Sequence, residues 1–327
     1  MTTSRSRVMI IGGAGFIGSH FTDALLADER TTRLTLYDNF SSGQEWHYAD
    51  HAGDERLAVL RGDANDLPAL TDAATGHDLI IHLASNPDIA AAIANPAIDF
   101  DQGTLITHHV VEAMRRSGVP RIVYASGSGV YGDLDEVEAS EDHGPLVPVS
   151  TYGASKLGGE ALISAYAHMF DLQGYVFRFG NVVGRRQTHG VGFDFVRRLR
   201  DDPTRLTVLG DGSQSKSYVL VTDVVAAVLT AVDATGEAPL NLFNVATGDY
   251  VTVREIVGLA FEVLGLDPAE TRVEYGVEAR GWKGDIPVVR LSTDRIRALG
   301  WRPSTGSAGA LKASMERMLE DLAAGRG

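Results

Sequence analysis

Three glycines spaced three residues apart, Gly12, Gly15 and Gly18, end an apolar run near the N-terminus of the sequence. The pattern predicts a β-strand that turns directly into a helix. Gly12 permits the tight turn, Gly15 lets the backbone approach a pyrophosphate, and Gly18 lets the helix pack closely on the sheet. A pyrophosphate at such a turn accepts hydrogen bonds from free N–H groups at the positive end of the helix dipole. The motif therefore predicts a dinucleotide-binding fold.

A second predicted strand, residues 33–38, ends in an acidic residue. Asp38 lies about 20 residues past the last glycine, which is the spacing at which the ribose of a dinucleotide finds a carboxylate acceptor. A carboxylate at this place repels the 2′-phosphate of NADP. We therefore expect NAD as the cofactor.

Short apolar segments alternate with amphipathic helical segments from Met1 to Arg178, which is typical of a Rossmann-type doubly wound parallel sheet in an α/β fold. Further strands are predicted at 57–63, 78–84 and 121–126, and helices at 102–117 and 150–170. A smaller α+β lobe is expected after Arg178, with helices at 193–201 and 253–264 and a strand with a tight turn at 206–212, while 242–246 is predicted as a last short strand of the core. We predict an NAD-binding domain over 1–178 and a substrate lobe over 179–327, with segments around 216–248 returning to the Rossmann core.

Polar residues in two of these strands have specific interpretations. Asp63 and Ala64 leave the carboxyl edge of the sheet where an adenine ring would be held. Asp63 is equally compatible with a helix N-cap for the following segment, and both interpretations stay open. His82 lies inside a continuous aliphatic strand, so we interpret it as a satisfied core histidine rather than a ligand.

The 327-residue chain carries a formal net charge of −14, a pI near 5.1 and no cysteine. This acidity disfavours nucleic acid and anionic membrane surfaces as partners, so local basic groups or backbone amides have to meet any phosphate-bearing ligand. The lack of cysteine excludes disulfides, thiolate nucleophiles and cysteine-ligated metal sites, and it fits a reducing cytoplasm. No signal peptide, membrane-spanning run or metal site is predicted.

Tyr152 and Lys156 lie four residues apart in a predicted helix, hence on one helical face. An unperturbed phenol is too weak a base at neutral pH, and a neighbouring ammonium group favours the phenolate. Such a lysine can also donate to the nicotinamide ribose. Ser126 and Ser128 stand at the end of the strand 121–126, at the edge where open α/β sheets bind ligands. These residues together predict a proton-transfer site.

In the order of these motifs the whole chain resembles the extended short-chain dehydrogenase/reductase superfamily, in its NAD-dependent nucleotide-sugar epimerase/dehydratase branch. The matching segments are the glycine triplet, Tyr37-Asp38-Asn39-Phe40, the serines before Val130-Tyr131-Gly132, the pair of Tyr152 and Lys156, Arg178-Phe179-Gly180-Asn181 and Leu299-Gly300-Trp301. The stretches 178–190 and 280–287 are most similar to archaeal-type UDP-glucose (UDP-galactose) 4-epimerases.

The resemblance implies that Tyr152 removes a proton from a sugar hydroxyl while NAD accepts the hydride from the same carbon. The 4-keto sugar then turns over and receives the hydride on its other face, so NAD acts as a bound prosthetic group. The resemblance implies cofactor contacts from Gly12, Gly15, Phe16, Ile17, Gly18, Asp38, Asn39, Ser42, Gly43, Asp63, Ala64, Leu83, Ala84, Tyr152 and Lys156. It implies nucleotide-sugar contacts from Ser85, Gly127, Asn181, Val191, Lys216, Arg280, Asp285 and Val289.

Among the positions that depart from the family pattern, three bear on the chemistry of the site. Gly127 stands where a serine or threonine usually donates to the reacting oxygen, so Ser126, Ser128, a water molecule or Tyr152 alone has to serve. Gly129 stands where dehydratases and decarboxylases of this branch usually carry an acidic residue, which disfavours elimination. Lys216 replaces the arginine that grips the diphosphate and offers a point charge in place of a bidentate fork.

The leading interpretation is C4 epimerisation of UDP-glucose and UDP-galactose. Epimerisation of UDP-glucuronate, UDP-GlcNAc or another nucleotide sugar, a dehydratase or decarboxylase, and a non-catalytic dinucleotide-binding protein are the alternatives. Val289 replaces a tyrosine that closes the pocket to N-acetyl sugars in some relatives, so we expect a C2 N-acetyl group to be tolerated. The resemblance also implies a homodimer, for which an apolar seam would come from Val110, Val111, Met114, Leu162, Ile163 and Tyr166 unless these residues pack on the sheet.

Overall fold

The computed structural model describes residues 5–234, 236 and 238–326. These residues form two compact units. The first contains the described residues up to 130, with 151–178 and 228–243, and the second contains 131–150, 179–227 and the residues from 244 onward. Residues 131–150 thus belong to the second unit, and 228–243 belong to the first.

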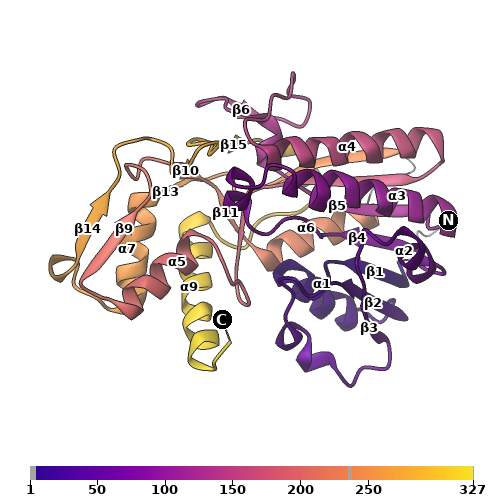
Figure 1. The fold of residues 1–327 in the computed structure, drawn as a ribbon, viewed down its shortest axis with the longest axis horizontal. Coiled ribbons are helices and arrows are strands. Elements are labelled where there is room, and N and C mark those ends of the chain that lie inside the picture. Colours follow the sequence, from indigo (N-terminus) through magenta and orange to yellow (C-terminus); the bar gives the residue numbers. More distant parts are fainter. Residues whose placement is uncertain (1–4, 235, 237, 327) are drawn as a thin grey trace. The chain divides into compact units, whose positions relative to one another are not determined.

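The first unit is built on a seven-stranded sheet in the order β12-β7-β5-β4-β1-β2-β3 (Figure 1). Its strands are β1 (Arg7–Ile11), β2 (Arg33–Asp38), β3 (Leu57–Arg61), β4 (Leu79–His82), β5 (Arg121–Gly127), β7 (Gln173–Phe179) and β12 (Leu240–Val245). The pairings β1–β2, β2–β3, β1–β4 and β4–β5 are parallel, as the Rossmann-type prediction requires. The strand order reverses between β1 and β4, and such sheets bind ligands in the crevice at that point.

Helices cover both faces of this sheet. They are α1 (Phe16–Ala27), α2 (Leu67–Ala74), α3 (Ile106–Ser117), preceded by a π-helix (Phe100–Leu105), and α4 (Thr151–Met169), while α6 (Val221–Ala234) passes from the second unit into the first. Leu70, Val110 and Ile163 of α2, α3 and α4 share one buried cluster with Met9 of β1, so these three helices cover one face (Figure 1). Phe21 of α1 is fully buried outside that cluster, which places α1 on the opposite face.

Four of the six residues predicted for a dimer seam are core residues instead. Val110, Val111 and Met114 have 0% exposure and Ile163 has 1%, and all four pack in the cluster against the sheet. The seam prediction is wrong for these four because a helix on a parallel sheet buries its apolar stripe against the strands. Leu162 and Tyr166 are half-buried.

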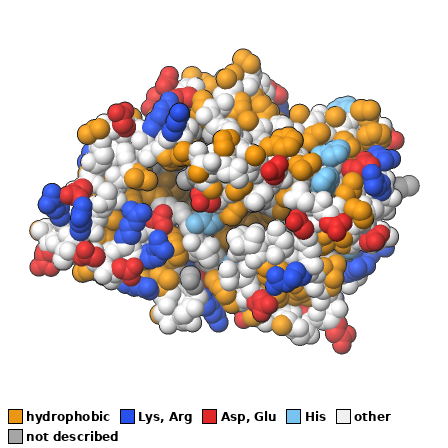
Figure 2. Space-filling view, in the orientation of Figure 1, with side chains coloured by type: hydrophobic (Ala, Val, Ile, Leu, Met, Phe, Trp, Pro, Cys, Tyr) orange, Lys and Arg blue, Asp and Glu red, His pale blue; other side chains and the backbone are white. Residues whose placement is uncertain are grey.

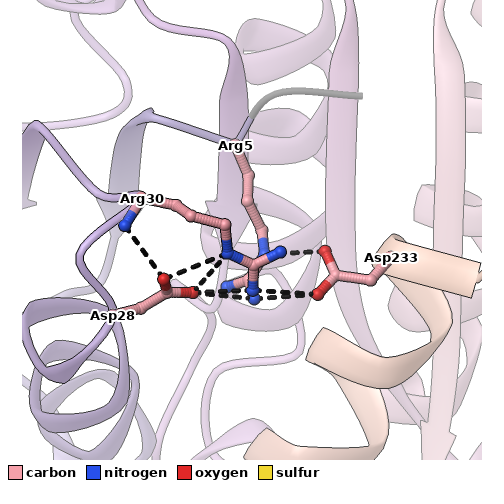
Figure 3. Close-up of polar contacts among 4 residues, drawn as sticks. All are labelled: Arg5, Asp28, Arg30 and Asp233. Atoms are coloured by element: carbon pink, nitrogen blue, oxygen red, sulfur yellow. Dashed lines mark hydrogen bonds and ion pairs between the residues drawn. The ribbon is translucent and has the colours of Figure 1, made fainter. Parts of the chain in front are cut away.

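A cluster of charged side chains ties the start of β1 to the ends of α1 and α6 (Figure 3). The Arg5 side chain, 4% exposed, pairs with Asp28 at 3.0 Å and with Asp233 at 2.8 Å. Arg30 pairs with the same two carboxylates at 2.8 and 3.2 Å. The hydrogen bond from Arg30 lowers the pKa of Asp28 to about 2. The cluster holds the segment that enters the first strand in place.

The second unit surrounds its own core with short paired strands. Its elements are β6 (Glu138–Ala139), β8 (Asn181–Val183), α5 (Val191–Asp201), β9 (Arg205–Val208), β10 (Ser215–Lys216), β11 (Tyr218–Leu220), β13 (Val251–Thr252), α7 (Val253–Leu264), β14 (Arg272–Tyr275), β15 (Arg290–Leu291), α8 (Asp294–Ala298) and α9 (Ser307–Ala323). Phe195, Ile256 and Met315 bring α5, α7 and α9 into one cluster. Thr252 and Glu255 form a capping box that starts α7, which satisfies N–H groups of its first turn.

Basic and acidic side chains are interspersed on the face drawn in Figure 2. Ion pairs of the second unit include Lys312 with Glu262 at 2.5 Å and Arg205 with Glu274 at 2.7 Å. Within the described part of the chain, none of the helices has the length and hydropathy needed to cross a bilayer.

Candidate active site

The glycine motif forms the predicted turn between β1 and α1. Gly12 has a φ of +80°, and a Cβ on it would lie 2.8 Å from the backbone nitrogen of Ala84. A Cβ on Gly18 would lie 2.5 Å from the carbonyl oxygen of Gly13. Gly15 is the N-cap of α1 and offers no side-chain cap. The N–H groups of the first turn are therefore available to an anion, which fits a dinucleotide pyrophosphate.

Asp38 stands beside this turn at the end of β2 and is 8% exposed. Its Oδ2 accepts a hydrogen bond from the Ala14 N–H at 2.9 Å, and its Oδ1 accepts one from Phe40 N–H at 2.8 Å. Each carboxylate oxygen keeps a further lone pair, so Asp38 can accept the hydroxyls of a ribose. A Cβ on Gly43 would lie 2.9 Å from Asp38 Oδ1, so glycine is needed for this close approach.

The N-cap interpretation of Asp63 is wrong. Asp63 Oδ1 accepts from Asn65 N–H at 2.9 Å, whereas Asp66 is the residue that caps α2, accepting from Ala69 N–H at 3.1 Å. The cap comes three residues later because residues 63–66 form a turn between β3 and α2, with Asp66 N–H donating to the Asp63 carbonyl at 2.9 Å. The adenine-binding role of Asp63 and Ala64 stays a prediction.

The other residues predicted to bind the cofactor lie close in sequence to this edge. Phe16 and Ile17 begin α1, Asn39 and Ser42 follow β2, and Leu83 and Ala84 follow β4. The N–H groups of Leu83 and Ala84 both donate to the Ile11 carbonyl, at 2.9 and 3.0 Å, which holds the segment after β4 against the glycine turn.

Tyr152 and Lys156 begin α4 on one face, as predicted. Lys156, 4% exposed, donates from Nζ to the Ala125 carbonyl at 2.8 Å, and the same Nζ lies 5.5 Å from the centroid of the Tyr152 ring. Burial lowers the pKa of Lys156 to about 8, against the attraction of Glu160 and Asp99. Burial also raises the pKa of Tyr152, and the charge of Asp99 adds to this, while the hydroxyl of Ser85 has a smaller lowering effect.

The hydroxyl of Ser126 hydrogen-bonds with a buried ion pair. Ser126 Oγ donates to Glu160 Oε1 at 2.5 Å, and Arg178 Nη2 pairs with Glu160 Oε2 at 2.7 Å. Gly127 faces open space, because a Cβ there would have no heavy atom within 4 Å. Ser128 is half-buried and makes no side-chain hydrogen bond with the described residues.

Two carboxylates near the pair of Tyr152 and Lys156 were not predicted from the sequence. Glu160 follows Lys156 by four residues, a spacing that places them on one helical face and is a usable signal. Asp99 is 1% exposed and accepts from Asn86 Nδ2 at 2.9 Å and from Thr151 Oγ1 at 2.7 Å. Nothing in the spacing of Asp99 indicates this place, although the residue directly precedes the π-helix as its N-cap.

His82 is a core residue, as predicted. Its Nε2 hydrogen-bonds with Thr107 Oγ1 at 3.1 Å, while Nδ1 has no partner among the described residues, so only one ring nitrogen is satisfied. Burial lowers the pKa of His82 to about 3, which keeps the ring neutral. Within the described ranges, no three His, Asp or Glu side chains are grouped to hold a metal ion.

The two cations predicted to hold a diphosphate lie in the second unit and both have carboxylate partners. Lys216 Nζ pairs with the buried Asp285 Oδ1 at 2.6 Å. Arg280 is exposed, pairs with Asp133 and donates to the carbonyl of Asp285. Lys216 and Arg280 thus converge on Asp285, which brings these three predicted residues together.

The remaining predicted substrate residues of the second unit lie on its short strands and at a helix start. Asn181 begins β8 and donates from Nδ2 to the Ser217 carbonyl at 3.1 Å. Val289 N–H donates to the Ser215 carbonyl at 3.3 Å, next to β10. Val191 begins α5 and packs against the core of the unit. Their contact with a sugar stays a prediction.

Comparison with known proteins matches these features to one group of enzymes. The sequence model of the NAD dependent epimerase/dehydratase family matches residues 8–246. The chain is 31% identical to the UDP-glucose 4-epimerase of Mycolicibacterium smegmatis over 318 residues, 95% of this chain and 97% of that protein. A UDP-galactose 4-epimerase structure, 33% identical, covers 97% of this chain and 99% of its own with a TM-score of 0.84. The dTDP-glucose 4,6-dehydratase DesIV of Streptomyces venezuelae, solved with NAD, is 29% identical over 97% of this chain and 98% of its own, with a TM-score of 0.88.

Proposed function

Because this chain belongs to the NAD dependent epimerase/dehydratase family, we propose that it epimerises a nucleotide-diphosphate hexose, most simply UDP-glucose and UDP-galactose at C4. Its cofactor is NAD, which the glycine turn and Asp38 fit. Bound NAD supplies a reversible hydride acceptor next to the sugar. The residues of the chain then have to bind the sugar nucleotide, orient it and move the proton of the reacting hydroxyl.

The observation that carries this proposal is the pairing of Tyr152 with Lys156. The Lys156 ammonium group, 5.5 Å from the phenol ring, favours the phenolate that can accept a proton from a sugar hydroxyl. Elimination of water from a sugar needs an additional acid or base, and Ser128 and Gly129 at the strand end offer no carboxylate. Proton transfer without elimination is what these residues support.

The substrate side of the proposal rests on the second unit. Lys216 and Arg280 are cations that can bind a diphosphate, and their pairing with Asp285 holds them together before the ligand arrives. Asn181 offers an amide at the start of β8, where it pairs with Tyr218 of β11, two residues past Lys216. Val289 is a smaller side chain than tyrosine, so we propose that UDP-GlcNAc is accepted along with UDP-glucose.

A nucleotide-sugar dehydratase is the second candidate, since the DesIV dehydratase has the higher TM-score of the two structures compared, 0.88 against 0.84. Product mass separates the two reactions. Epimerisation conserves mass, whereas dehydration loses water and decarboxylation of a uronic acid loses carbon dioxide.

The test is to incubate the purified protein with UDP-glucose, UDP-GlcNAc and UDP-glucuronate in separate reactions, without added NAD, and to follow products by NMR and mass spectrometry. Formation of a C4 epimer of unchanged mass is expected. Tyr152→Phe is the matched variant: it should abolish turnover while retaining bound NAD, because it removes only the phenol oxygen. A mass loss of 18 or 44 Da would overturn the epimerase proposal, and activity in Tyr152→Phe would overturn the role of the phenol.

We also propose that the protein works as a homodimer in the cytoplasm. The family resemblance supports pairing through α3 and α4, on which Leu162 and Tyr166 keep exposed surface. Light scattering after size exclusion tests the dimer: a mass near 70 kDa is expected from the 35.0 kDa chain, and 35 kDa would refute it.

A further inference from the structure

The backbone of Ala14, in the middle of the glycine turn, is held by the segment that follows β2. The Ala14 carbonyl accepts a hydrogen bond from the Gln44 N–H at 3.0 Å and a second one from His47 Nδ1 at 2.7 Å. A carbonyl oxygen has two lone pairs, so these two donors saturate it. The Ala14 N–H in turn donates to Asp38 Oδ2 at 2.9 Å. Both polar backbone groups of Ala14 are therefore fixed by residues 38–47.

His47 contributes a side chain to this arrangement from outside the glycine motif. It ends the short 3₁₀-helix Glu45–His47 and is 1% exposed. Its ring packs against that of Trp46, with 4.2 Å between the two centroids. Because a carbonyl oxygen can only accept, Nδ1 of His47 has to carry the proton of the bond to Ala14. Packing and one directed hydrogen bond thus set the orientation and the tautomer of the ring.

The turn held in this way is the one whose N–H groups fit a dinucleotide pyrophosphate. The Ala14 carbonyl and the Gly15 N–H belong to one planar peptide group, so a donor that holds the carbonyl also sets the direction of that N–H. Gly15 is the N-cap of α1, and its N–H donates to the Gly12 carbonyl at 3.3 Å. Rotation of this peptide group would redirect the entry into α1 and the N–H groups of its first turn.

We propose that His47 is a positioning residue for NAD: through the Ala14 carbonyl it keeps the glycine turn in the shape that binds the pyrophosphate. The proposal deepens the proposed function, in which NAD is regenerated in each cycle and its release would interrupt turnover. It assigns the retention of the cofactor in part to a buried histidine that lies 32 residues past Gly15 in the sequence.

Three variants of His47 test the proposal by where they place a donor. The amide nitrogen of His47→Asn can take the place of Nδ1, the amide nitrogen of His47→Gln lies further along the side chain, and His47→Leu has no donor. The protein is purified with its NAD, and its exchange with radiolabelled NAD in solution is timed without any sugar. Loss of one buried hydrogen bond should accelerate the exchange about tenfold in His47→Leu and His47→Gln. His47→Asn should stay within about twofold of wild type, because it keeps the bond.

His51→Asn is the matched control. His51 belongs to the neighbouring 3₁₀-helix, Ala49–His51, and its Nε2 hydrogen-bonds with Asp23 at 2.8 Å, away from the Ala14 carbonyl. This variant should exchange NAD at the wild-type rate. If His47→Leu does not fold, the comparison of His47→Gln with His47→Asn carries the test by itself.

The wild-type protein gives an independent measurement. In ¹⁵N NMR of histidine-labelled protein at pH 8, His47 should carry its proton on Nδ1, with the signal assigned by its absence in His47→Asn. A proton on Nε2, wild-type exchange in His47→Leu and His47→Gln, or equal acceleration in His47→Asn and His47→Gln would overturn the proposal. Neither measurement involves a sugar, so a failure of the proposed epimerase function would leave both results unchanged.

Discussion

The buried ion pair of Glu160 and Arg178 offers a sharp test of how the first unit is stabilised. The two side chains are 9% and 3% exposed, and their contact of 2.7 Å is joined by the 2.5 Å bond from Ser126. Glu160→Gln keeps the shape of the side chain but removes its charge. The buried Arg178, whose guanidinium cannot lose its proton, then loses the charge of the carboxylate that it contacts at 2.7 Å.

Removing one partner of a buried pair costs about 3–5 kcal/mol. With a urea m value of about 3 kcal/mol per M, this loss lowers the unfolding midpoint by about 1 to 1.7 M. Urea unfolding followed by far-UV circular dichroism measures the shift. The m value should stay unchanged, because the variant alters the folded state and not the surface exposed on unfolding.

Glu112→Gln on α3 is the matched control. Glu112 also accepts from two arginine contacts, at 2.8 Å from Arg115 and 2.7 Å from Arg116, but these arginines are 42% and 48% exposed. Water solvates these exposed arginines when the carboxylate charge is lost, so the urea midpoint should move by only a small fraction of the Glu160→Gln shift. Equal shifts in the two variants would refute the reasoning that burial of Arg178 sets the cost.

Three other outcomes follow from the structure. Lys156 has a pKa of about 8 in the folded protein and 10.5 ordinarily, so the unfolded chain binds more protons between these two pH values. The free energy of unfolding of wild type, measured relative to that of Lys156→Met, should therefore rise from pH 8 to 10.5. A difference that stays flat over this range would contradict the prediction. Gly12→Ala should purify without NAD, because φ at this position is +80° and the new Cβ meets the backbone of Ala84. Gly53→Ala, with open space around it, is the control and should retain NAD, as measured by absorbance and mass. Equal amounts of bound NAD in the two variants would contradict the role of the turn geometry. Val289→Tyr should abolish turnover of UDP-GlcNAc while UDP-glucose still reacts, and loss of both by NMR would count against a size filter at this position.

The sequence predicted the parallel sheet well because its central strands β1, β2, β4 and β5 are almost entirely buried and largely apolar, and it predicted α7 because the apolar periodicity and the N-cap of that helix are clear. The glycine turn was predictable because only glycine fits its backbone. The place of Asp99 was less accessible: its hydrogen bond with Thr151 joins residues 52 positions apart, and no local pattern in the sequence indicates that they meet. The position of the α2 cap was wrong because several nearby aspartates have equal capping propensity.

The chain crosses between its two units five times, after residues 130, 150, 178, 227 and 243. A fragment cut at residue 178 would therefore lose β12, the neighbour of β7 in the sheet. β7 would then become an unprotected edge strand with unpaired backbone groups. It would also expose Tyr175 and Phe177, which have 0% exposure in the intact chain, to other molecules. Such a fragment should aggregate. The substrate specificity of this chain therefore has to be changed by substitutions in its loops and not by exchanging one terminal half for that of another protein.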